Sequence, residues 1–368
     1  MKIDTLTLTQ FRNYENERFV FDPAVNLICG RNGQGKTNLL EAAAACSTMR
    51  LFRTAQKKEG LRFGADKASI LAEFEAQARP ISLELRLSRV KAMEIYKNGV
   101  RQKRQADAQG LLKTVLFCPE DLLLVRAGAS ARRRFLDTAL CQLRPYYARY
   151  LEEYNRLHEH KTRILRDSEE KPSLLSLWED FSLRMAQLGA QLIRYRAYYC
   201  KKLLAAAGEV YRDIAPHETL TGRYQTVSTV TDPFAGAKQI EKELADHVYA
   251  HRTAEIAAKS CLSGPHKDDL VLELDGRAAA AYGSQGQVRT CTLSMKLAER
   301  ALFFAEDGAY PVLLLDDVLS ELDRVRQDFV LNHITDGQVL ITCCEDDISD
   351  KLRAGAVFTI KNGKIICS

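Results

Sequence analysis

The sequence has 368 residues, of which 27% are charged and 46% belong to the apolar set that includes Tyr, Trp and Cys. This is a globular composition that excludes collagen-like and disordered chains, and the length is enough for two structural units. The 10 Cys are scattered without a CxxC pair, which excludes a disulfide-stapled scaffold and predicts reduced thiols in a cytoplasmic protein. We expect no signal peptide and no membrane span, because no apolar run is long enough.

The positive charge is concentrated in the middle of the sequence. The net charge is +5, from 53 Lys and Arg against 48 Asp and Glu. Residues 126–212 contain 17 basic and 10 acidic residues, whereas the rest of the chain is slightly acidic. A solvated helical surface is one interpretation, and a surface that binds nucleic-acid phosphates is the other.

The first 125 residues read as strands and turns. Apolar and polar residues alternate over 3–8 and 81–87, residues 24–29 form a short apolar run, and Asn98-Gly99 marks a hairpin turn. From residue 130 the pattern becomes helical. We expect Ser130 to cap a first helix and Pro145 to begin a second that ends near residue 167; a third helix follows over 174–213.

After residue 216 the pattern returns to alternating elements. We expect β structure over 220–231, helices over 236–258 and 288–304, strands over 269–274, 312–315 and 339–342, and a hairpin over 358–366 that turns at Asn362-Gly363. The predicted fold class is α/β, with a helical block inserted into it. The predicted parts are an N-terminal half (1–125), an inserted helical lobe (126–260) and a C-terminal half (261–368).

A glycine-rich segment after the strand at 24–29 fits the phosphate-loop pattern GxxxxGK[ST]. Its glycines let backbone N–H groups face phosphates, and the following helix contributes its N-terminal dipole. Lys36 would reach the β- and γ-phosphates, and Thr37 would bind Mg²⁺. The predicted nucleotide-binding residues here are Gly30, Arg31, Asn32, Gly33, Gln34, Gly35, Lys36 and Thr37.

The apolar strand at 312–315 ends in the carboxylates Asp316 and Asp317. Such strands are common core elements, but a phosphate-loop enzyme also needs a strand that brings a carboxylate to the magnesium ion. We therefore predict that Asp316 binds Mg²⁺ and that Asp317 orients or deprotonates the attacking water. With Lys36, these residues form the predicted catalytic set.

Two further segments have either a capping role or a nucleotide-binding role. Gly283 to Gln287 precedes the helix at 288–304, so Ser284, Gly286 and Gln287 could form a second anion site or simply cap the helix. Residues 320–323, ending in Asp323, have the same two interpretations. The order of these two segments after the phosphate loop favours the nucleotide-binding role for both.

That order resembles the one found in ABC-type ATPases: phosphate loop, signature, carboxylate strand and D-loop. Lys36 and Asp316 are 280 positions apart, which resembles the SMC-like branch, where an insertion separates the two ATPase halves. Over essentially the whole chain the sequence is similar to the RecF family of bacterial recombination and replication-repair proteins. The matching segments are FRNY (11–14), GRNGQGKTNLLEA (30–42), FCPEDL (117–122), RRRFLD (132–137), SGPHKDD (263–269), YGSQGQVRT (282–290) and LLLDDVLSELD (313–323).

The resemblance implies an ATP-dependent DNA-binding protein with ATP and Mg²⁺ as cofactors. It implies action on single-stranded or gapped DNA with RecO and RecR, loading of RecA, and support of the SOS response. It also implies an ATP-dependent head-to-tail homodimer and weak, DNA-stimulated ATP hydrolysis that serves as a switch. Ser284 and Gly286 of one subunit would contact the γ-phosphate held by Lys36 of the other, so hydrolysis would release the dimer.

The sequence departs from the ABC pattern in three places. Asp317 stands where many of these ATPases have Glu. Cys343-Cys344 follows the strand at 339–342, where transporter ATPases place a switch histidine, and no Gln for a Q-loop occurs in 111–125. His266 could act as a base, but we interpret it as a residue that orders its loop by hydrogen bonds.

DNA contact is expected on the face of the ATPase halves and on the helical block. The predicted phosphate-contacting residues are Arg132, Arg133, Arg134, Arg144 and Arg149. Tyr147, Tyr150 and Tyr154 have helical spacing, which is typical of a packing stripe but would also suit base stacking.

Two other functions remain open. The energising subunit of a transporter shares the four motifs, but it needs a membrane partner and a much shorter spacing between phosphate loop and signature. The second is a nucleotide-gated scaffold that does not hydrolyse ATP. With Asp317 in place of Glu and no switch histidine, ATP-gated dimerisation would be its only activity.

Overall fold

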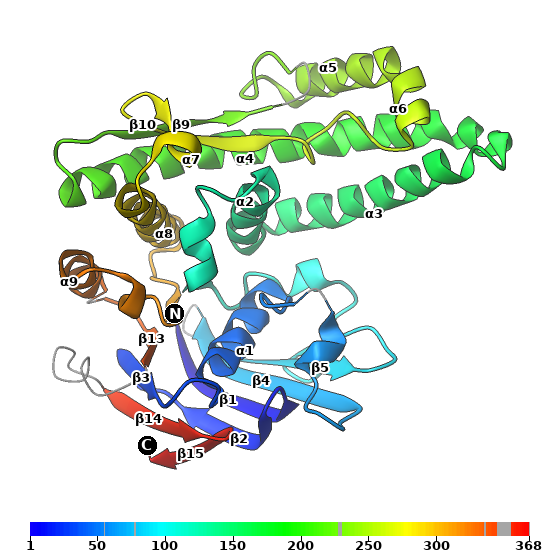
Figure 1. Ribbon diagram of the computed structural model, residues 1–368. Helices are drawn as coiled ribbons and strands as arrows, with labels where there is room; N and C mark the ends of the chain where they lie inside the picture. Colours follow the sequence, from blue (N-terminus) through cyan, green and yellow to red (C-terminus); the bar gives the residue numbers. More distant parts are fainter. Residues whose placement is uncertain (55, 77–78, 227–229, 335, 344–354, 368) are drawn as a thin grey trace. The chain divides into compact units, whose positions relative to one another are not determined.

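The structure is a computed structural model that describes residues 1–54, 56–76, 79–226, 230–334, 336–343 and 355–367 (Figure 1). The chain forms two compact units. Unit 1 comprises Met1–Leu123 and Arg289–Ser368, and unit 2 comprises Leu124–Val288. The insertion predicted from the sequence is therefore present, and both units combine helices with sheets.

Unit 1 contains an antiparallel sheet with the strand order β2-β1-β4-β5-β6-β7. Apolar residues alternate along its long strands, so one face is buried. The hairpin between β6 and β7 turns at Asn98 and Gly99, which both have positive φ, as the Asn-Gly signal predicts. The strands are β1 (Lys2–Phe11), β2 (Tyr14–Val20), β4 (Lys67–Ala76), β5 (Arg79–Ser88), β6 (Glu94–Lys97) and β7 (Val100–Arg101).

The second sheet of unit 1 has the order β15-β14-β3-β13-β12-β8. Its strands are parallel except for the C-terminal hairpin of β14 and β15, and β12 is buried throughout. Parallel strands of this kind read as continuous apolar runs. The strands are β3 (Val25–Cys29), β8 (Thr114–Phe117), β12 (Val312–Leu315), β13 (Val339–Cys343), β14 (Ala356–Lys361) and β15 (Lys364–Cys367).

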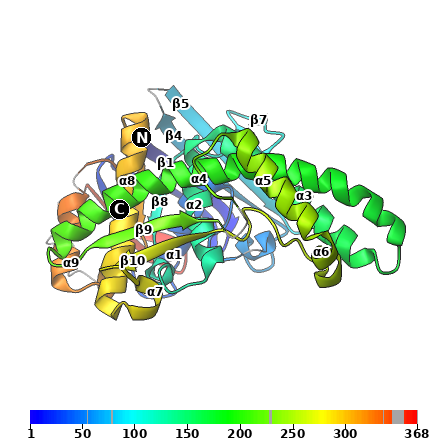
Figure 2. The same ribbon diagram turned by 90° about the horizontal axis from the view of Figure 1, so that it is seen from above.

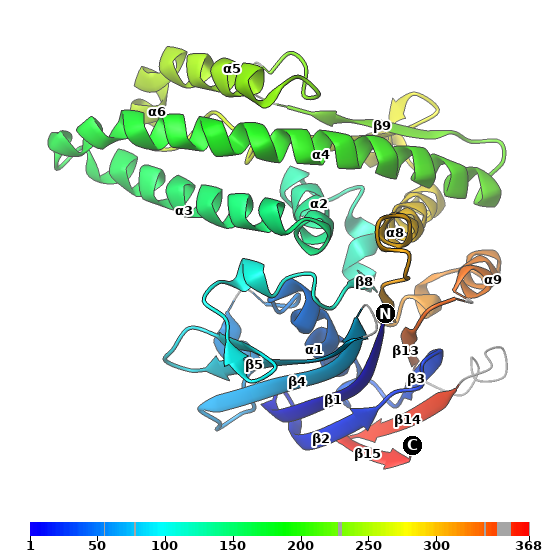
Figure 3. The ribbon, with the colours of Figure 1, turned by 180° about the vertical axis from the view of Figure 1, so that it is seen from behind.

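Helix α1 (Lys36–Thr48) contacts strands of both sheets and shares one hydrophobic core with them (Figure 3). It is buried along most of its length, which suits its run of alanines. Unit 1 also contains α9 (Arg324–His333). Helix α8 (Gln285–Asp307) belongs to both units, because unit 2 ends at Val288 and unit 1 resumes at Arg289. Short 3-10 helices span Lys57–Gly60, Gln105–Asp107, Pro119–Leu123 and Leu319–Glu321.

Unit 2 is built around the long helix α4 (Trp178–Ile214), which packs against α3 (Pro145–Asp167), α5 (Ala237–Ala250) and β9 (Leu220–Gln225) (Figures 1 and 2). Pro145 begins α3, as predicted. The antiparallel order β11-β10-β9 forms a small third sheet. The remaining elements are α2 (Ala129–Leu143), a 3-10 helix (Pro172–Leu177), α6 (Arg252–Ala258), β10 (Asp269–Leu274), β11 (Arg277–Ala278) and α7 (Ala279–Tyr282).

Several predicted boundaries were wrong. Ser130 is not a cap, because α2 begins at Ala129 with Gly128 as its N-cap. The helix expected over 236–258 is broken at His251 into α5 and α6. The helical insertion was expected to end at residue 260, yet unit 2 continues to Val288, because β10 pairs with β9 in the third sheet. Within the described residues, no helix is long and apolar enough to span a membrane.

Candidate nucleotide-binding site

The predicted phosphate loop lies between β3 and α1, in the strand–loop–helix context that such loops require. Gly35 is the N-cap of α1 with φ of 117°, and a Cβ there would lie 2.6 Å from the Asn13 amide. Only glycine fits this combination of backbone angle and space. The loop from Gly30 to Gly35 therefore delivers Lys36 and Thr37 to the first turn of a helix, where backbone N–H groups favour anions.

The Lys36 side chain folds back over the loop. Its Nζ donates to the carbonyl oxygen of Gly30 and lies 3.4 Å from that of Arg31, and the residue is 6% exposed. The charged group is thus held above the loop backbone, where phosphates would bind. The role of Lys36 at the β- and γ-phosphates stays a prediction.

The structure brings Thr37 and Asp316 together from positions far apart in the sequence. The parallel strands β3, β13 and β12 end at the same edge of the sheet, so the residues after them meet there. Thr37 Oγ1 donates to Asp316 Oδ1 at 3.0 Å, and Thr342 Oγ1 donates to the same atom at 3.1 Å. The predicted pairing of the phosphate loop with the carboxylate strand is present in unit 1.

These oxygens fit a magnesium ion. Mg²⁺ prefers octahedral oxygen ligands at 2.0–2.1 Å, so two adjacent ligands should lie about 2.9 Å apart. The Thr37–Asp316 separation of 3.0 Å matches that requirement. Burial of Asp316 raises the pKa of its carboxyl, the hydrogen bonds from Thr37 and Thr342 oppose this, and the charges of Asp317 and Glu120 add to it. A cation at this point would relieve the cost of the buried charge.

Asp317 has a left-handed backbone conformation, with φ of 52°, which is uncommon for a residue other than glycine. Its N–H donates to Thr342 Oγ1 at 2.8 Å, and Ser320 Oγ donates to its carboxylate at 3.2 Å. Thr342 therefore bonds to both aspartates. The role of Asp317 in positioning water stays a prediction.

Two turns brace the phosphate loop, and neither was predicted from the sequence to have a role there. Asn13 Nδ2 donates to the Gln34 carbonyl at 2.7 Å, and Tyr14 OH donates to the Gly35 carbonyl at 2.9 Å. From the C-terminal hairpin, the Gly363 N–H donates to the same Gln34 carbonyl at 3.0 Å. FRNY and Asn362-Gly363 were visible as motifs, but their contacts depend on tertiary packing.

The next turn of α1 is also anchored. Arg12 forms a bidentate ion pair with Glu41, whose side chain is buried, at 2.8 and 3.1 Å. A bidentate guanidinium–carboxylate pair fixes orientation as well as distance. The turn between β1 and β2 thus holds both the loop and the helix that follows it.

The predicted signature loop lies in unit 2 and forms a capping box. The Ser284 N–H donates to Gln287 Oε1 at 2.8 Å, and the Gln287 N–H donates to Ser284 Oγ at 3.2 Å. Gln287 Nε2 also donates to Glu218 at 3.0 Å. Gly286 lies in the first turn of α8. The capping interpretation is confirmed, and a nucleotide-binding role for Ser284, Gly286 and Gln287 stays a prediction.

Asp323 is likewise an N-cap. Its side chain accepts from the Arg326 N–H at 3.0 Å at the start of α9, and hydrogen bonds from Arg326 lower its pKa. The segment after the carboxylate strand therefore has a structural role, as its capping alternative predicted. Contact of Asp323 with a nucleotide stays a prediction.

The region searched for a Q-loop contains a 3-10 helix at Pro119–Leu123. Glu120 in this helix is close enough to affect the pKa of Asp316, and Asp121 pairs with Lys296 at 3.2 Å. In the switch-histidine region, Cys343 ends β13 and Cys344 lies outside the described residues.

The predicted arginine track in unit 2 is only partly available for DNA. Arg132 is bonded to both carboxylate oxygens of Asp269 at 2.7 Å, and Arg133 donates to the Asp268 carbonyl at 2.6 Å. Arg134 and Arg149 are exposed, and Arg144 is half-buried. DNA contact by Arg132 stays a prediction, and its bond to Asp269 was not visible in the sequence.

The tyrosine stripe and His266 belong to the interior of unit 2. Tyr147 and Tyr154 are buried, which agrees with the packing stripe favoured by their spacing and leaves these two rings unavailable for base stacking. His266 Nε2 donates to the Cys261 carbonyl at 3.1 Å, Nδ1 accepts from Tyr154 at 2.7 Å, and burial lowers the pKa of His266 to about 3. These contacts agree with the loop-ordering role that the sequence suggested.

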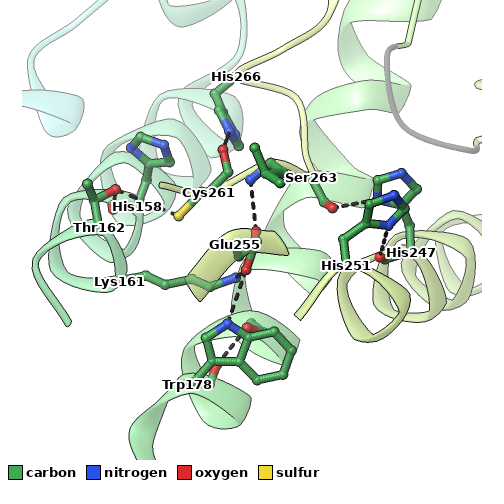
Figure 4. A network of polar contacts seen from close by, with 12 residues as sticks. His158, Lys161, Thr162, Trp178, His247, His251, Glu255, Cys261, Ser263 and His266 are labelled. Carbon is green, nitrogen blue, oxygen red and sulfur yellow. Dashed lines mark hydrogen bonds and ion pairs between the residues drawn. The ribbon is translucent and has the colours of Figure 1, made fainter. Parts of the chain in front are cut away.

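A buried ion pair lies near this histidine (Figure 4). Lys161 Nζ is 2.6 Å from Glu255, which also accepts from Trp178 Nε1 at 3.1 Å and from the Leu262 N–H at 2.8 Å. Lys161 and Glu255 are at most 1% exposed. Buried charges need such complete pairing, so this network explains how the polar interior of unit 2 is tolerated.

Comparison with known proteins identifies the class of protein to which this chain belongs. The family model for the RecF/RecN/SMC N terminal domain matches residues 2–365. The structure is similar to an Smc head domain from Pyrococcus furiosus, with a TM-score of 0.57 at 15% identity over 99% of this chain and 95% of that one, which shows the fold alone. Fold and phosphate site together define an ABC-type ATPase head of the SMC-like kind.

Curated relatives narrow this class. The chain is 36% identical over 372 residues to "DNA replication and repair protein RecF" of Bacillus subtilis, covering 100% of both chains. It is 35% identical to the protein of that name from Enterococcus faecalis, covering 99% and 98%. A solved structure of "the recombination mediator protein RecF-ATPrS in RecFOR pathway" has a TM-score of 0.92 at 29% identity, covering 99% and 97%. The chain belongs to the RecF family.

Proposed function

We propose that this protein acts in DNA replication and repair as an ATP-dependent, DNA-binding switch. The observation that carries the proposal is the meeting of Thr37 and Asp316, 3.0 Å apart, beside a phosphate loop in strand–loop–helix context. Additional support comes from a relative solved as "the recombination mediator protein RecF-ATP in RecFOR pathway", which covers 99% of this chain.

ATP would bind through the phosphate loop. The N–H groups between Gly30 and Thr37 would receive the phosphates, and the Lys36 ammonium would move from the loop carbonyls to the β- and γ-phosphate oxygens. Thr37 and Asp316 would hold the magnesium ion. Bound Mg²⁺ would neutralise the charge that develops on the phosphates.

Asp317 would orient or deprotonate the water that attacks the γ-phosphate. Its hydrogen bonds with Thr342 and Ser320 support a fixed orientation beside Asp316. Aspartate is one methylene shorter than glutamate, so we expect slow turnover, as suits a switch rather than a metabolic enzyme.

Dimerisation would complete the site. Ser284, Gly286 and Gln287 of a second copy would bind the γ-phosphate, with Asp323 beside them, in a head-to-tail arrangement. Ser284 and Gln287 already fix the N-terminus of α8, whose dipole favours an anion. Because these contacts need the γ-phosphate, ATP would stabilise the dimer and ADP would not.

The dimer would bind single-stranded or gapped DNA and would work with RecO and RecR to load RecA, in support of the SOS response. Arg134, Arg144 and Arg149 would contact phosphates without reading sequence, on the basis of their basic side chains in α2 and α3.

The test is binding of a gapped duplex by the purified protein, followed by fluorescence anisotropy with ATP, with ADP and without nucleotide. We expect tighter binding with ATP alone, and we expect Lys36→Arg to lose that difference. Equal affinity under all three conditions would contradict the proposal.

A scaffold that never hydrolyses ATP is the second candidate, favoured by the short Asp317 and by the lack of a histidine between Cys343 and Leu352. Phosphate release in the presence of DNA separates the two functions, and the Lys36→Arg protein controls for contaminating ATPase. Membership of the RecF family leaves the transporter alternative without support.

A further inference from the structure

Two cysteines stand side by side at the base of the phosphate loop. Cys29 is the last residue of β3, directly before Gly30, and Cys343 is the last residue of β13. The strands are parallel neighbours in which Cys29 and Cys343 are register partners. Their Sγ atoms are 3.0 Å apart, at a distance where either thiol can donate to the other.

This geometry suits a disulfide. Neighbouring strands lie about 4.7–4.9 Å apart, within the range of about 4.4–6.8 Å that disulfides span between Cα atoms. A disulfide has an S–S bond of about 2.05 Å, so the sulfur atoms would have to approach by roughly 1 Å. A movement of that size requires a small shift at the ends of the strands and no change in their pairing.

We propose that Cys29 and Cys343 form an oxidative modification site, in which a hydroperoxide such as hydrogen peroxide converts the two thiols to a disulfide. Cys29 is partly exposed and Cys343 is 3% exposed, so Cys29 meets the oxidant first. Its thiolate takes one oxygen from the peroxide, giving a sulfenic acid and, after proton uptake, water.

The second step joins the sulfurs. The Cys343 thiol loses its proton and attacks the sulfenic sulfur, the S–O bond breaks, and the oxygen leaves as water after protonation. In total, two thiols and one hydrogen peroxide give one disulfide and two waters. The cysteines lose two electrons, and the peroxide gains them.

The disulfide would act on the phosphate loop. Cys29 is bonded to Gly30, whose carbonyl accepts from Lys36, so a displaced strand end also displaces the start of the loop. We expect oxidation to weaken ATP binding by about tenfold, equivalent to ~1.4 kcal/mol. By linkage, bound ATP disfavours the disulfide by the same factor. This consequence rests on the proposed function, whereas the disulfide itself does not.

The first experiment maps the crosslink in the full-length protein. Reduced protein is treated with hydrogen peroxide, the remaining thiols are blocked, and peptides are analysed by mass spectrometry without reduction. Cys344 adjoins Cys343 in sequence, so single variants assign the bond. We expect the Cys29 crosslink to persist in Cys344→Ser and to disappear in Cys343→Ser. The reverse pattern, or no crosslink to Cys29 in wild type, would overturn the proposal.

The second experiment measures ATP affinity before and after oxidation, and again after reduction with dithiothreitol. We expect a reversible loss in wild type and in Cys344→Ser, and none in Cys29→Ser. If the reduced protein does not bind ATP although the crosslink forms, the proposed function fails and the modification site stands. If ATP affinity is equal in both redox states, the effect on the phosphate loop is wrong.

Discussion

The two loops predicted to bind nucleotide both contain glycine and precede helices, but they are held in place differently. In unit 1, the loop before α1 is held from outside by Asn13, Tyr14 and Gly363, which bond to its carbonyl groups. In unit 2, the loop before α8 closes on itself through the reciprocal bonds of Ser284 and Gln287. The first arrangement satisfies loop carbonyl groups from other parts of the chain, whereas the second satisfies the N–H groups of Ser284 and Gln287 within the loop itself.

The difference indicates which residues should affect binding and which should affect stability. A polar group whose bonds are completed within the chain contributes to folding, and its loss leaves a partner unsatisfied. A charged group held over backbone carbonyls, such as Lys36, can exchange those contacts for phosphate oxygens. Five experiments with substituted proteins test this distinction.

The largest effect is expected at Lys36. Lys36→Met removes the side-chain cation that reaches back over the loop carbonyls, so ATP affinity should fall by about 100-fold, or ~2.7 kcal/mol. Isothermal titration calorimetry with ATP and Mg²⁺ measures it. Thermal unfolding without nucleotide should change little; a large fall in Tm together with unchanged ATP affinity would reverse the assignment.

Arg132 and Arg134 provide a matched pair on helix α2. Arg132→Gln breaks the bidentate bond to Asp269 and should reduce the free energy of unfolding by about 2 kcal/mol. Arg134→Gln changes an exposed residue and should leave the free energy of unfolding unaltered. It should reduce the slope of log DNA affinity against log salt concentration by about one. Urea unfolding and salt titrations of DNA binding distinguish them. Exchange of the two phenotypes would refute the distinction.

Asn13 tests the external bracing of the phosphate loop. Asn13→Ala removes the bond to the Gln34 carbonyl and the one received from Asn38, so the loop loses part of its fixed shape. We expect ATP affinity to fall by about tenfold, or ~1.4 kcal/mol. Tyr14→Phe, which removes one bond to Gly35, is the milder control. ATP affinity equal to wild type in Asn13→Ala would show that the brace is dispensable.

His266 tests an internally bonded group through pH. Its pKa is lowered to about 3 in the folded protein, so the unfolded chain takes up a proton near pH 6.5 while the folded chain does not. Stability should therefore fall as pH drops, by about 1.2 kcal/mol between pH 7 and pH 5.5. His266→Gln should flatten this dependence in urea unfolding measured at both pH values. An unchanged slope would mean that His266 is not the group responsible.

Ser284 should give the smallest effect in the isolated subunit. Ser284→Ala removes one half of the capping box and should lower stability by about 1 kcal/mol, with Gln287→Ala as the reciprocal control. ATP affinity of the monomer should stay unchanged. Loss of monomer affinity would place this loop in the site of its own subunit and contradict the proposed arrangement.

The sequence predicted the local parts of the site well. Backbone geometry imposes the spacing of the phosphate loop. The apolar run that ends at Leu315 predicted a buried strand with Asp316 directly after it. The Asn98-Gly99 and Asn362-Gly363 turns followed from their need for positive φ. Such features depend on a few neighbouring residues, which a single sequence displays directly.

What the sequence could not show depends on long-range packing. Thr342 bonds to both aspartates because β13 lies between β3 and β12, and no local pattern reveals that strand order. Asn13 and Arg132 find partners elsewhere in the chain. The later edge of the helical unit was misplaced for the same reason, since β10 joins unit 2 by pairing with β9.

The most direct test of the account is sedimentation of the purified protein under ATP, ADP and no nucleotide, with and without a gapped duplex, beside an Asp317→Asn variant. We predict a dimer that forms only with ATP, is stabilised by DNA and lasts longer in the variant, where hydrolysis is slowed. A protein that stays monomeric under every condition, or that dimerises equally well without nucleotide, would contradict the claim that ATP controls assembly.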